Sequence, residues 1–250
     1  MARAKGSIAK RALVAILVVV ALLVAGTIWY VNDYYHADDI ALAVVADADG
    51  DADGVVVKEL PDGKIAFEPA NPTAGLVFYP GAKVQPEAYA PLLKQLAERG
   101  VLCVLVKPLF NLAIIDMDAA NGIEGEFPEI DSWAIAGHSM GGVAACDYAE
   151  RHENEFETVA LLASYPAVDL SGFEGNVISL YGTEDGVLNH EKLADAQGLL
   201  PADAREVAIE GGNHAYYGNY GEQAGDGVAR ITRETQQIQT AEEIARLVME

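Results

Sequence analysis

The chain has 250 residues, which is long for one ordinary domain and short for two, so we expect one folded unit plus a small additional segment. Hydrophobic residues make up 51% and charged residues 22%, a composition that excludes a disordered chain and can supply a sizeable core. The formal net charge is −22, from 38 acidic and 16 basic residues. Nucleic-acid binding needs clustered Lys and Arg to neutralise phosphates, so this balance argues against a DNA or RNA partner.

The N-terminus has the pattern of a membrane anchor. Residues 1–11 contain four basic side chains and no acid, and residues 12–32 carry no charge at all. At about 1.5 Å per residue, a helix over residues 12–32 spans roughly the hydrocarbon core of a bilayer. Trp29 and Tyr30 stand where an aromatic interface belt would fall, and the basic start favours a cytoplasmic N-terminus. We therefore predict a single-pass signal-anchor in the cell membrane, with the rest of the chain outside the cytoplasm.

A cleaved signal peptide is the alternative interpretation of the same segment, and it would yield a secreted protein. Signal peptides also begin with basic residues, but their apolar region is usually about 7–15 residues long and ends at a small-residue cleavage site. Ala25 and Gly26 form only a weak site of that kind. The length of the apolar run therefore favours a retained anchor.

Cys103 and Cys146 are the only cysteines of the chain. Neither directly follows the apolar segment, so lipid attachment to a cysteine there is excluded. Cys103 lies in an apolar run and Cys146 in a run of small residues, where burial is the usual role of cysteine. A disulfide between them stays open at this point, because spacing alone does not determine it.

Residues 33–54 form an acidic connector that contains an aspartate repeat. Asp49, Asp51 and Asp53, with the glycine that follows, match the opening of an EF-hand loop, whose alternate carboxylates converge on calcium. The position of the bidentate glutamate is occupied by Leu60, however, and the residues before it have a strand pattern instead of an exiting helix. We therefore favour a solvated acidic loop over a calcium site.

Strand and helix patterns alternate over residues 55–250. Residues 60–63 are a turn sequence between two β-rich runs, so a hairpin opens this domain. Residues 101–106 are apolar at every position, as expected for a central parallel strand covered by helices on both faces. The predicted strands are 55–59, 64–68, 76–79, 101–106, 133–136, 158–163, 177–181 and 206–209, and the predicted helices are 89–97, 112–120, 142–151, 191–199 and 235–248. This order predicts an α/β fold with a doubly wound, mostly parallel sheet.

The sequence GHSMGG at residues 137–142 follows a predicted strand and precedes a predicted helix. It contains the pattern GxSxG in the strand–turn–helix context of a nucleophile elbow. In such an elbow a sharp turn exposes the serine hydroxyl, and the glycines let strand and helix approach closely. We therefore predict Ser139 as a nucleophile.

A serine hydroxyl needs a histidine to accept its proton and an acid to orient that histidine. On a parallel α/β fold these groups follow the serine in the order acid, then histidine. Asp185 follows the apolar strand pattern of residues 177–181, and His214 follows that of residues 206–209. Because strand ends of one parallel sheet share an edge, we predict Asp185 as the acid and His214 as the base.

Several neighbouring residues are rivals for these roles. His190 follows the acid loop and is the main rival base, although a surface position at a helix start is its more ordinary role. Glu184 and Asp169 are rival acids, which we expect to be solvated. His138 precedes the nucleophile, and we expect its side chain to point elsewhere.

Two backbone amides are candidates for the oxyanion hole. One is that of Met140, directly after the nucleophile, and the other is that of Ala82, in the loop after an early strand. Lys83 could steer an anionic substrate from the same loop, and Tyr216 and Tyr217 could line a substrate pocket. The alternatives are a solvated lysine and tyrosines that only pack.

Five spaced segments carry a resemblance to a known family: YPGAKVQPEAYAPL, FPEIDSWAIAGHSMGG, LASYPAVDLS, YGTEDGV and EGGNHAYYGNYGEQ. They resemble the α/β-hydrolase superfamily, in its compact dienelactone-hydrolase-like branch, and a group of bacterial membrane-anchored α/β hydrolases. The resemblance covers nearly all of residues 55–250 and implies a nucleophile at Ser139, an acid at Asp185 and a base at His214. Dienelactone hydrolases use a cysteine nucleophile, so their substrate does not carry over. An HGGG-type oxyanion loop is also lacking, which leaves the role of Ala82 less supported than that of Met140.

Together these features predict a membrane-anchored serine hydrolase that cleaves a small-molecule ester through an acyl-enzyme on Ser139. This chemistry requires no metal and no organic cofactor. Thioester, amide and acyl-transfer reactions use the same groups, so the residues indicate a mechanism and not a substrate. The alternative is a catalytically inactive binding or envelope protein on the same fold.

Overall fold

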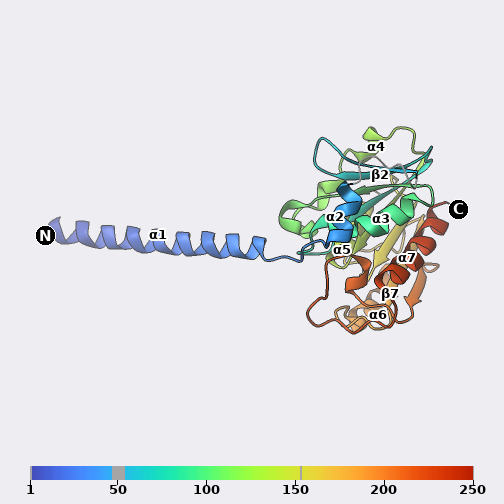
Figure 1. Ribbon diagram of the computed structural model, residues 1–250. Helices are drawn as coiled ribbons and strands as arrows, with labels where there is room; N and C mark the ends of the chain where they lie inside the picture. The colour runs from blue at the N-terminus through green and yellow to red at the C-terminus, as the bar shows by residue number, and fades with distance from the viewer. Residues whose placement is uncertain (1, 47–53, 153, 250) are drawn as a thin grey trace. The chain divides into compact units, whose positions relative to one another are not determined.

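The computed structural model describes residues 2–46, 54–152 and 154–249, and the chain divides into two units, Met1–Tyr34 and Tyr35–Glu250 (Figure 1). The first unit is essentially helix α1, Ala2–Asn32. Its part Lys10–Asn32 has a mean hydropathy of 2.8, and none of that span is buried. Helix α1 is therefore long and apolar enough to cross a membrane, a property that signal sequences share.

The second unit, called the sheet unit below, is built on one eight-stranded sheet with the order β1-β2-β4-β3-β5-β6-β7-β8. Strand β2 pairs antiparallel with β1 and β4, and the other neighbouring strands pair in parallel. This topology confirms the doubly wound, mostly parallel sheet. The strands are β1 Val55–Glu59, β2 Ile65–Pro69, β3 Ala74–Tyr79, β4 Val101–Leu105, β5 Ser132–His138, β6 Thr158–Leu162, β7 Asn176–Gly182 and β8 Arg205–Ile209.

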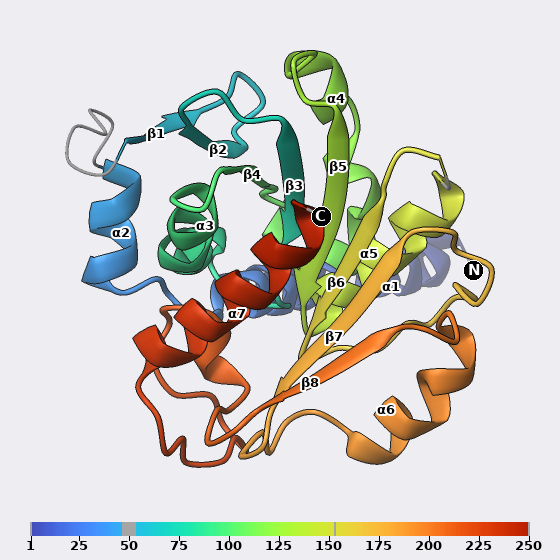
Figure 2. The ribbon, with the colours of Figure 1, turned by 90° about the vertical axis from the view of Figure 1, so that its right-hand side faces the viewer.

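Helices cover both faces of the sheet, which explains why its central strands are apolar at every position (Figure 2). One face packs against α2 (Asp39–Ala46), α3 (Ala90–Ala97) and α7 (Arg233–Val248). The other carries α5 (Met140–Arg151), the short α4 (Ile123–Glu126) and α6 (His190–Asp195). Two apolar cores result, one on each side of the sheet.

The two cysteines belong to different cores. Cys103 in β4 faces the core under α3 and α7, whereas Cys146 in α5 lies in the core on the opposite face. Both are free and buried, and burial raises the pKa of each thiol. The sheet between them excludes the disulfide that the sequence left open.

The sheet unit begins earlier than the predicted boundary at residue 55. Tyr35 forms a β-bridge with Val84, and the amide of Asp38 donates to the carbonyl of Asn219 over 2.8 Å. Helix α2 contacts α3 and buries Ala41 completely. Much of the expected connector is therefore part of the packed unit, while the aspartates of the calcium hypothesis lie outside the described residues.

The predicted helix over residues 112–120 is wrong. Two short 3₁₀ turns occupy this stretch, Ala113–Ile115 and Met117–Ala120, and a third, Leu109–Asn111, precedes it. Leu112 and Asp116, on either side of the first of these turns, have φ and ψ of −129° and 89° and of −143° and 50°, which an α-helix does not accommodate. Ala113 and Ala120 are buried in this arrangement, whereas Ile114 and Ile115 are exposed.

Candidate active site

Ser139 occupies a sharp turn between β5 and α5, with φ 53° and ψ −122°. A non-glycine residue in such a conformation costs about 1–3 kcal/mol, and surrounding structure must hold it there. Two glycines make the turn possible. A Cβ on Gly137 would lie 2.3 Å from the carbonyl carbon of Gly141, and one on Gly141 would lie 2.3 Å from the carbonyl oxygen of Tyr79. The GxSxG pattern thus reflects close backbone approach on both sides of Ser139.

Ser164, directly after β6, helps to fix this turn. Its hydroxyl donates a 2.7 Å hydrogen bond to the carbonyl oxygen of Ser139. The same hydroxyl occupies the space that a Cβ on Gly142 would need, at 2.4 Å. Gly142, the second glycine after Ser139, therefore makes room for the side chain that holds the backbone of Ser139.

Asp185 and His214 form a buried pair at the carboxyl edge of the sheet, where the parallel strands end. Nδ1 of His214 lies 2.8 Å from Oδ2 of Asp185, and their side chains are 2% and 0% exposed. The second carboxylate oxygen of Asp185 accepts hydrogen bonds from the amides of Val187 and Leu188, over 2.9 and 2.7 Å. The carboxylate is thereby held in one orientation and presents a single oxygen to the imidazole.

Asp226 connects the loop after β7, which carries Asp185 and is called the acid loop below, with the loop after β8, which carries His214 and is called the base loop. The sequence analysis did not predict this role. Its Oδ1 accepts from the amides of Gly186 and His214, over 3.1 and 3.2 Å, and its Oδ2 from the amide of Ala215, over 2.9 Å. Asp226 lies in an acidic, glycine-rich loop with no pattern that marks a site. Its function depends on three amides that only the fold brings together.

Helix α7 holds the base loop from the other side. The side-chain amide of Gln236 makes two hydrogen bonds with the backbone of Asn213, accepting over 3.0 Å and donating over 2.8 Å. Gln236 is fully buried. The residue before His214 is therefore fixed by a polar contact inside the core, where unmatched polar groups are costly.

Ser139 and His214 line one cavity of about 240 Å³. Its other walls come from α5, the loops after β6 and β7, and Ile114 in the segment after β4. Nε2 of His214 is buried and makes no hydrogen bond within the described part of the chain. Because Nδ1 is bonded to Asp185, Nε2 is the nitrogen that remains for proton exchange with the serine hydroxyl.

The two candidate oxyanion donors lie on adjoining elements. Met140 is the first residue of α5, so its amide has no carbonyl partner one turn earlier in the helix. In the loop after β3, the amide of Gly81 donates to the hydroxyl of Tyr89 and that of Lys83 to the carbonyl of Asn111. Among the described residues, no hydrogen bond uses the amide of Ala82 between them. Both amides thus retain the donor capacity that an oxyanion needs.

His138 does not point away from the site as expected. Its ring centroid lies 4.5 Å from that of His214, and its Nδ1 lies 2.8 Å from the hydroxyl oxygen of Tyr89. Burial, and secondarily the neighbouring His214, hold the pKa of His138 well below its usual value. The lowered pKa favours the neutral form of His138, whose ring packs against His214 and is held by Tyr89.

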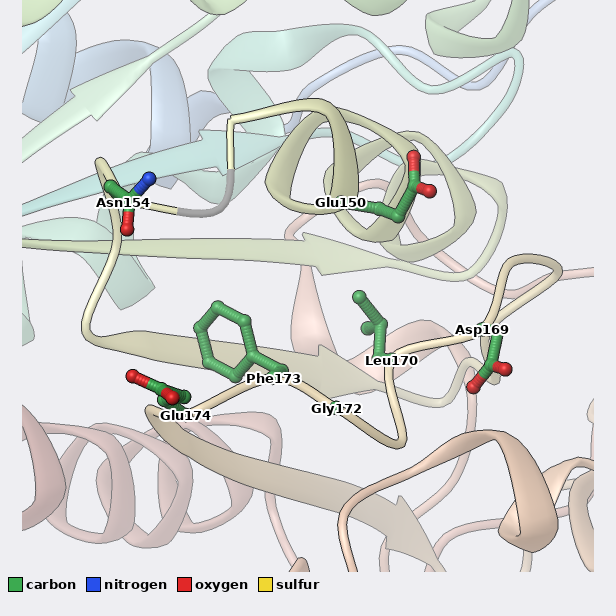
Figure 3. Close-up of a pocket in the computed structure, with 7 residues that line it drawn as sticks. All are labelled: Glu150, Asn154, Asp169, Leu170, Gly172, Phe173 and Glu174. Atoms are coloured by element: carbon green, nitrogen blue, oxygen red, sulfur yellow. The ribbon is translucent and has the colours of Figure 1, made fainter.

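The rival residues face other surroundings. His190 is exposed, approaches the backbone carbonyl of Asp185 and packs edge-on against the ring of Tyr181, and Glu184 pairs with Arg230 over 3.1 Å. Asp169 lines a separate cavity of about 270 Å³ between α5 and the loop after β6 (Figure 3). Its carboxylate accepts from the amide of Ser171. None of the three contacts the ring of His214.

The three candidate pocket residues do not line the cavity beside Ser139. Tyr217 is fully buried, and its ring packs against that of His138 at 5.4 Å. The guanidinium carbon of Arg233 lies over the ring of Tyr216, 4.8 Å from the centroid of that ring. Lys83 has a positive φ of 56° and is half-buried in the loop after β3. The tyrosines serve packing, because the base loop turns them inward.

Metal ligands do not gather around this site. Over residues 2–46, 54–152 and 154–249, no group of three or more His, Cys, Asp or Glu side chains is arranged to hold a metal ion. The arrangement that is present, a strained serine beside a buried Asp–His pair and two amide donors, suits nucleophilic attack on a carbonyl carbon.

Comparison with known proteins finds solved structures of the same fold. A search of curated proteins found no match. Dienelactone hydrolase from Anabaena variabilis is 13% identical, with a TM-score of 0.58, and 78% of this chain matches 98% of that one. A thermophilic esterase from Thermogutta terrifontis is 17% identical, with a TM-score of 0.50, and the match covers 76% of this chain and 91% of the esterase. A membrane phospholipase A described as a bacterial virulence factor is 14% identical, with a TM-score of 0.56. The match covers 95% of this chain and 99% of the phospholipase.

Such low identities show a shared fold. The family described as "Alpha/beta hydrolase family" matches residues 75–238, which include Ser139, Asp185 and His214. This range is more than half of the chain, and it runs from β3 into α7. The protein is therefore a member of the alpha/beta hydrolase family.

Proposed function

We propose that the protein is a serine hydrolase that cleaves carboxylic esters through an acyl-enzyme on Ser139. The observation that carries this proposal is the buried Asp185–His214 pair, joined over 2.8 Å, beside a cavity that Ser139 also lines. Ser139 is held in a strained turn with φ 53°. A binding protein has no need of this combination of strain and buried charge.

In the acylation step, the hydroxyl oxygen of Ser139 attacks the ester carbonyl carbon while His214 takes its proton. The charge that develops on the carbonyl oxygen is stabilised by the amides of Met140 and Ala82. Asp185 stabilises the imidazolium. The carbon–oxygen bond to the alcohol then breaks, and the imidazolium gives its proton to the departing alcohol.

In the deacylation step, His214 takes a proton from water, whose oxygen attacks the acyl carbon. The bond from the acyl group to Ser139 breaks, the proton returns to the serine oxygen, and a carboxylic acid leaves. Throughout both steps Asp226 keeps the acid and base loops in register, since it binds amides of both.

The proposed location follows from helix α1. Its apolar span, Lys10–Asn32, would cross the membrane once with the basic N-terminus in the cytoplasm, so that the sheet unit lies outside. The mass of the membrane-extracted protein distinguishes a retained anchor from a cleaved signal. A C-terminal alkaline phosphatase fusion, which is active only outside the cytoplasm, tests the orientation.

Labelling and turnover test the catalytic mechanism. The full chain in detergent is treated with a fluorophosphonate probe and assayed with p-nitrophenyl esters of increasing chain length, beside Ser139→Ala. We expect labelling and turnover in the wild-type protein and neither in the variant. A folded wild-type protein without labelling would overturn the mechanism and leave an inactive binding protein as the interpretation.

A further inference from the structure

Next to the catalytic cavity, the sheet unit exposes a group of apolar side chains, called the apolar lip below. We propose that the apolar lip contacts the surface of a lipid bilayer and that the ester substrate is a lipid drawn from that bilayer. The proposal rests on the proposed function, because it concerns the substrate of the same site. The apolar lip consists of Leu109, Phe110, Ile114, Ile115 and Met140, which are 60%, 54%, 43%, 57% and 37% exposed.

Exposed apolar side chains that occur singly are ordinary, but a contiguous group marks an interaction surface. Four of the five come from seven consecutive residues, LFNLAII at 109–115, which carry no charge in a chain of net charge −22. Met140 joins them from the start of α5, which contacts this segment. An uncharged apolar surface on a strongly acidic protein is suited to a hydrocarbon boundary.

Local hydrogen bonds hold the segment in this exposed arrangement. The amide of Leu109 donates to the carboxylate of Asp116 over 2.9 Å, and the carbonyl of Asn111 accepts from the amide of Lys83 over 2.7 Å. Phe110 is kept at a φ of 57°, a conformation unfavourable for a bulky residue. The apolar side chains are thus presented outward by a constrained backbone.

The apolar lip is continuous with the catalytic cavity. Ile114 and Met140 line the cavity together with Ser139 and His214. A lipid acyl chain that passes over the apolar lip would therefore reach the nucleophile without leaving an apolar surface. Burial of each such side chain in hydrocarbon is favourable, which offsets part of the cost of extracting a lipid.

Chain connectivity favours a bilayer as the partner. Asp33 and Tyr34 alone separate the end of α1 from Tyr35, whose amide donates to the carbonyl of Lys83 over 2.7 Å. Lys83 follows Ala82 in the loop after β3, at the carboxyl edge of the sheet. Two residues extend about 7 Å at most, so a bilayer that holds α1 would lie within a short length of chain from Tyr35 and from the Lys83 carbonyl that Tyr35 binds.

The test uses the full chain reconstituted in phosphatidylcholine vesicles, with two substrates. One is water-soluble p-nitrophenyl acetate, and the other is p-nitrophenyl palmitate dissolved in the bilayer. The variant combines Leu109→Asn, Phe110→Asn and Ile115→Asn, which spares the two cavity-lining residues. Asparagine is polar, uncharged and compatible with a positive φ. The control combines Val56→Asn and Val228→Asn, two exposed apolar residues elsewhere in the sheet unit.

We expect the rate of palmitate hydrolysis by the variant to fall by about 10-fold or more, because the variant binds the bilayer more weakly. Its rate of acetate hydrolysis should stay within about two-fold of the wild-type rate. The control should keep both activities. Equal palmitate hydrolysis by variant and wild type would overturn the proposal, as would a wild type that hydrolyses acetate but not palmitate. Loss of acetate hydrolysis by the wild type would instead overturn the proposed function.

A second measurement tests bilayer contact without catalysis. Phe110→Trp is compared with Val56→Trp, both in a Trp29→Phe background, in vesicles that contain brominated phosphatidylcholine. Bromine quenches only an indole that reaches the acyl region. We expect at least about three-fold stronger quenching at position 110 than at position 56, because interfacial apolar side chains insert about 5–10 Å. Equal quenching at the two positions would refute membrane contact by the apolar lip.

Discussion

The two sides of the catalytic cavity are built by different means. On one side, the loops after β7 and β8 are fixed by buried polar contacts: Asp185 accepts three hydrogen bonds, and Asp226 bridges both loops. On the other side, the segment of residues 109–126 consists of short turns that expose apolar side chains. In the proposed mechanism, the first side fixes the groups that move the proton, and the second side borders the path of the substrate to Ser139.

This difference separates chemistry from access. Proton transfer depends on sub-ångström placement, which fixed donors and acceptors provide. Substrate entry tolerates variation, so apolar turns are sufficient for it. Substitutions in the polar loops should therefore change the rate of hydrolysis at saturation, whereas substitutions in the apolar segment should change which substrates react.

The largest effect is expected at the acid. Asp185→Asn should lower kcat by about 10⁴-fold, because the amide no longer stabilises the imidazolium and favours the wrong tautomer of His214. Steady-state hydrolysis of p-nitrophenyl acetate measures this change. Glu184→Gln is the matched control, since Glu184 pairs with Arg230 and not with His214. If the control were as damaging as Asp185→Asn, the assignment of the acid would be wrong.

A smaller loss is expected when the link between the polar loops is removed. Asp226→Ala should lower kcat by about 10²-fold with little change in KM, because His214 shifts relative to Ser139 while the cavity persists. Asp226→Asn should restore part of the activity, since its carbonyl oxygen still accepts from backbone amides. Asp195→Ala, at an exposed position of α6, is the control. An increase in KM alone would show that Asp226 acts on binding instead.

His138 should make the free energy of unfolding decrease at acidic pH. Because burial lowers the pKa of His138 in the folded protein, the unfolded chain binds a proton below pH 6.5 that the folded chain does not. Stability is therefore lost as the pH falls, by about 1.4 kcal/mol for each pH unit below 6.5. Urea unfolding of the full chain in detergent at pH 7.5 and 5.5 measures this loss. His138→Gln should reduce the loss, and His36→Gln, at an exposed position, should not.

The smallest effect is expected in the apolar segment. Phe110→Gly removes an exposed ring and relieves the positive φ, at the entropic cost of a glycine. These two contributions nearly cancel, so the free energy of unfolding should change by less than about 1 kcal/mol. A loss above about 2 kcal/mol would show that Phe110 packs in the fold and would weaken the contrast between the two sides.

Local patterns in the sequence predicted the frame of the fold correctly. Hydrophobic periodicity and turn residues predict the hairpin of β1 and β2, the apolar strand β4, and the helices α3, α5 and α7. Alternating strands and helices must bury their apolar faces in layers, so the fold class follows from them. The region after β4 could not be predicted in this way. We predicted a helix over residues 112–120, but the backbone at Leu112 and Asp116 is not helical, and two short 3₁₀ turns stand in its place.

The candidate site shows the same division between local and long-range information. The sharp turn at Ser139 could be predicted because strand, turn and helix adjoin in the sequence, while the roles of Ser139, Asp185 and His214 as nucleophile, acid and base stay predictions. The roles of Asp226, Gln236 and His138 depend on contacts with residues 11 to 76 positions away, such as the 2.8 Å bond from Gln236 to Asn213 and the ring contact of His138 with His214. No local signal marks such pairs.

By itself, the sequence determined the apolar N-terminal segment, the alternation of strands and helices, and the serine turn, because each depends on residues close together in the chain. Only the tertiary structure decided that the ring of His138 lies against that of His214, that Tyr217 packs inward, and that Leu109, Phe110, Ile114 and Ile115 after β4 are exposed. These outcomes depend on which loops meet at the carboxyl edge of the sheet. Long-range packing and backbone hydrogen bonds determine which loops come into contact, and the sequence of a single segment does not contain this information.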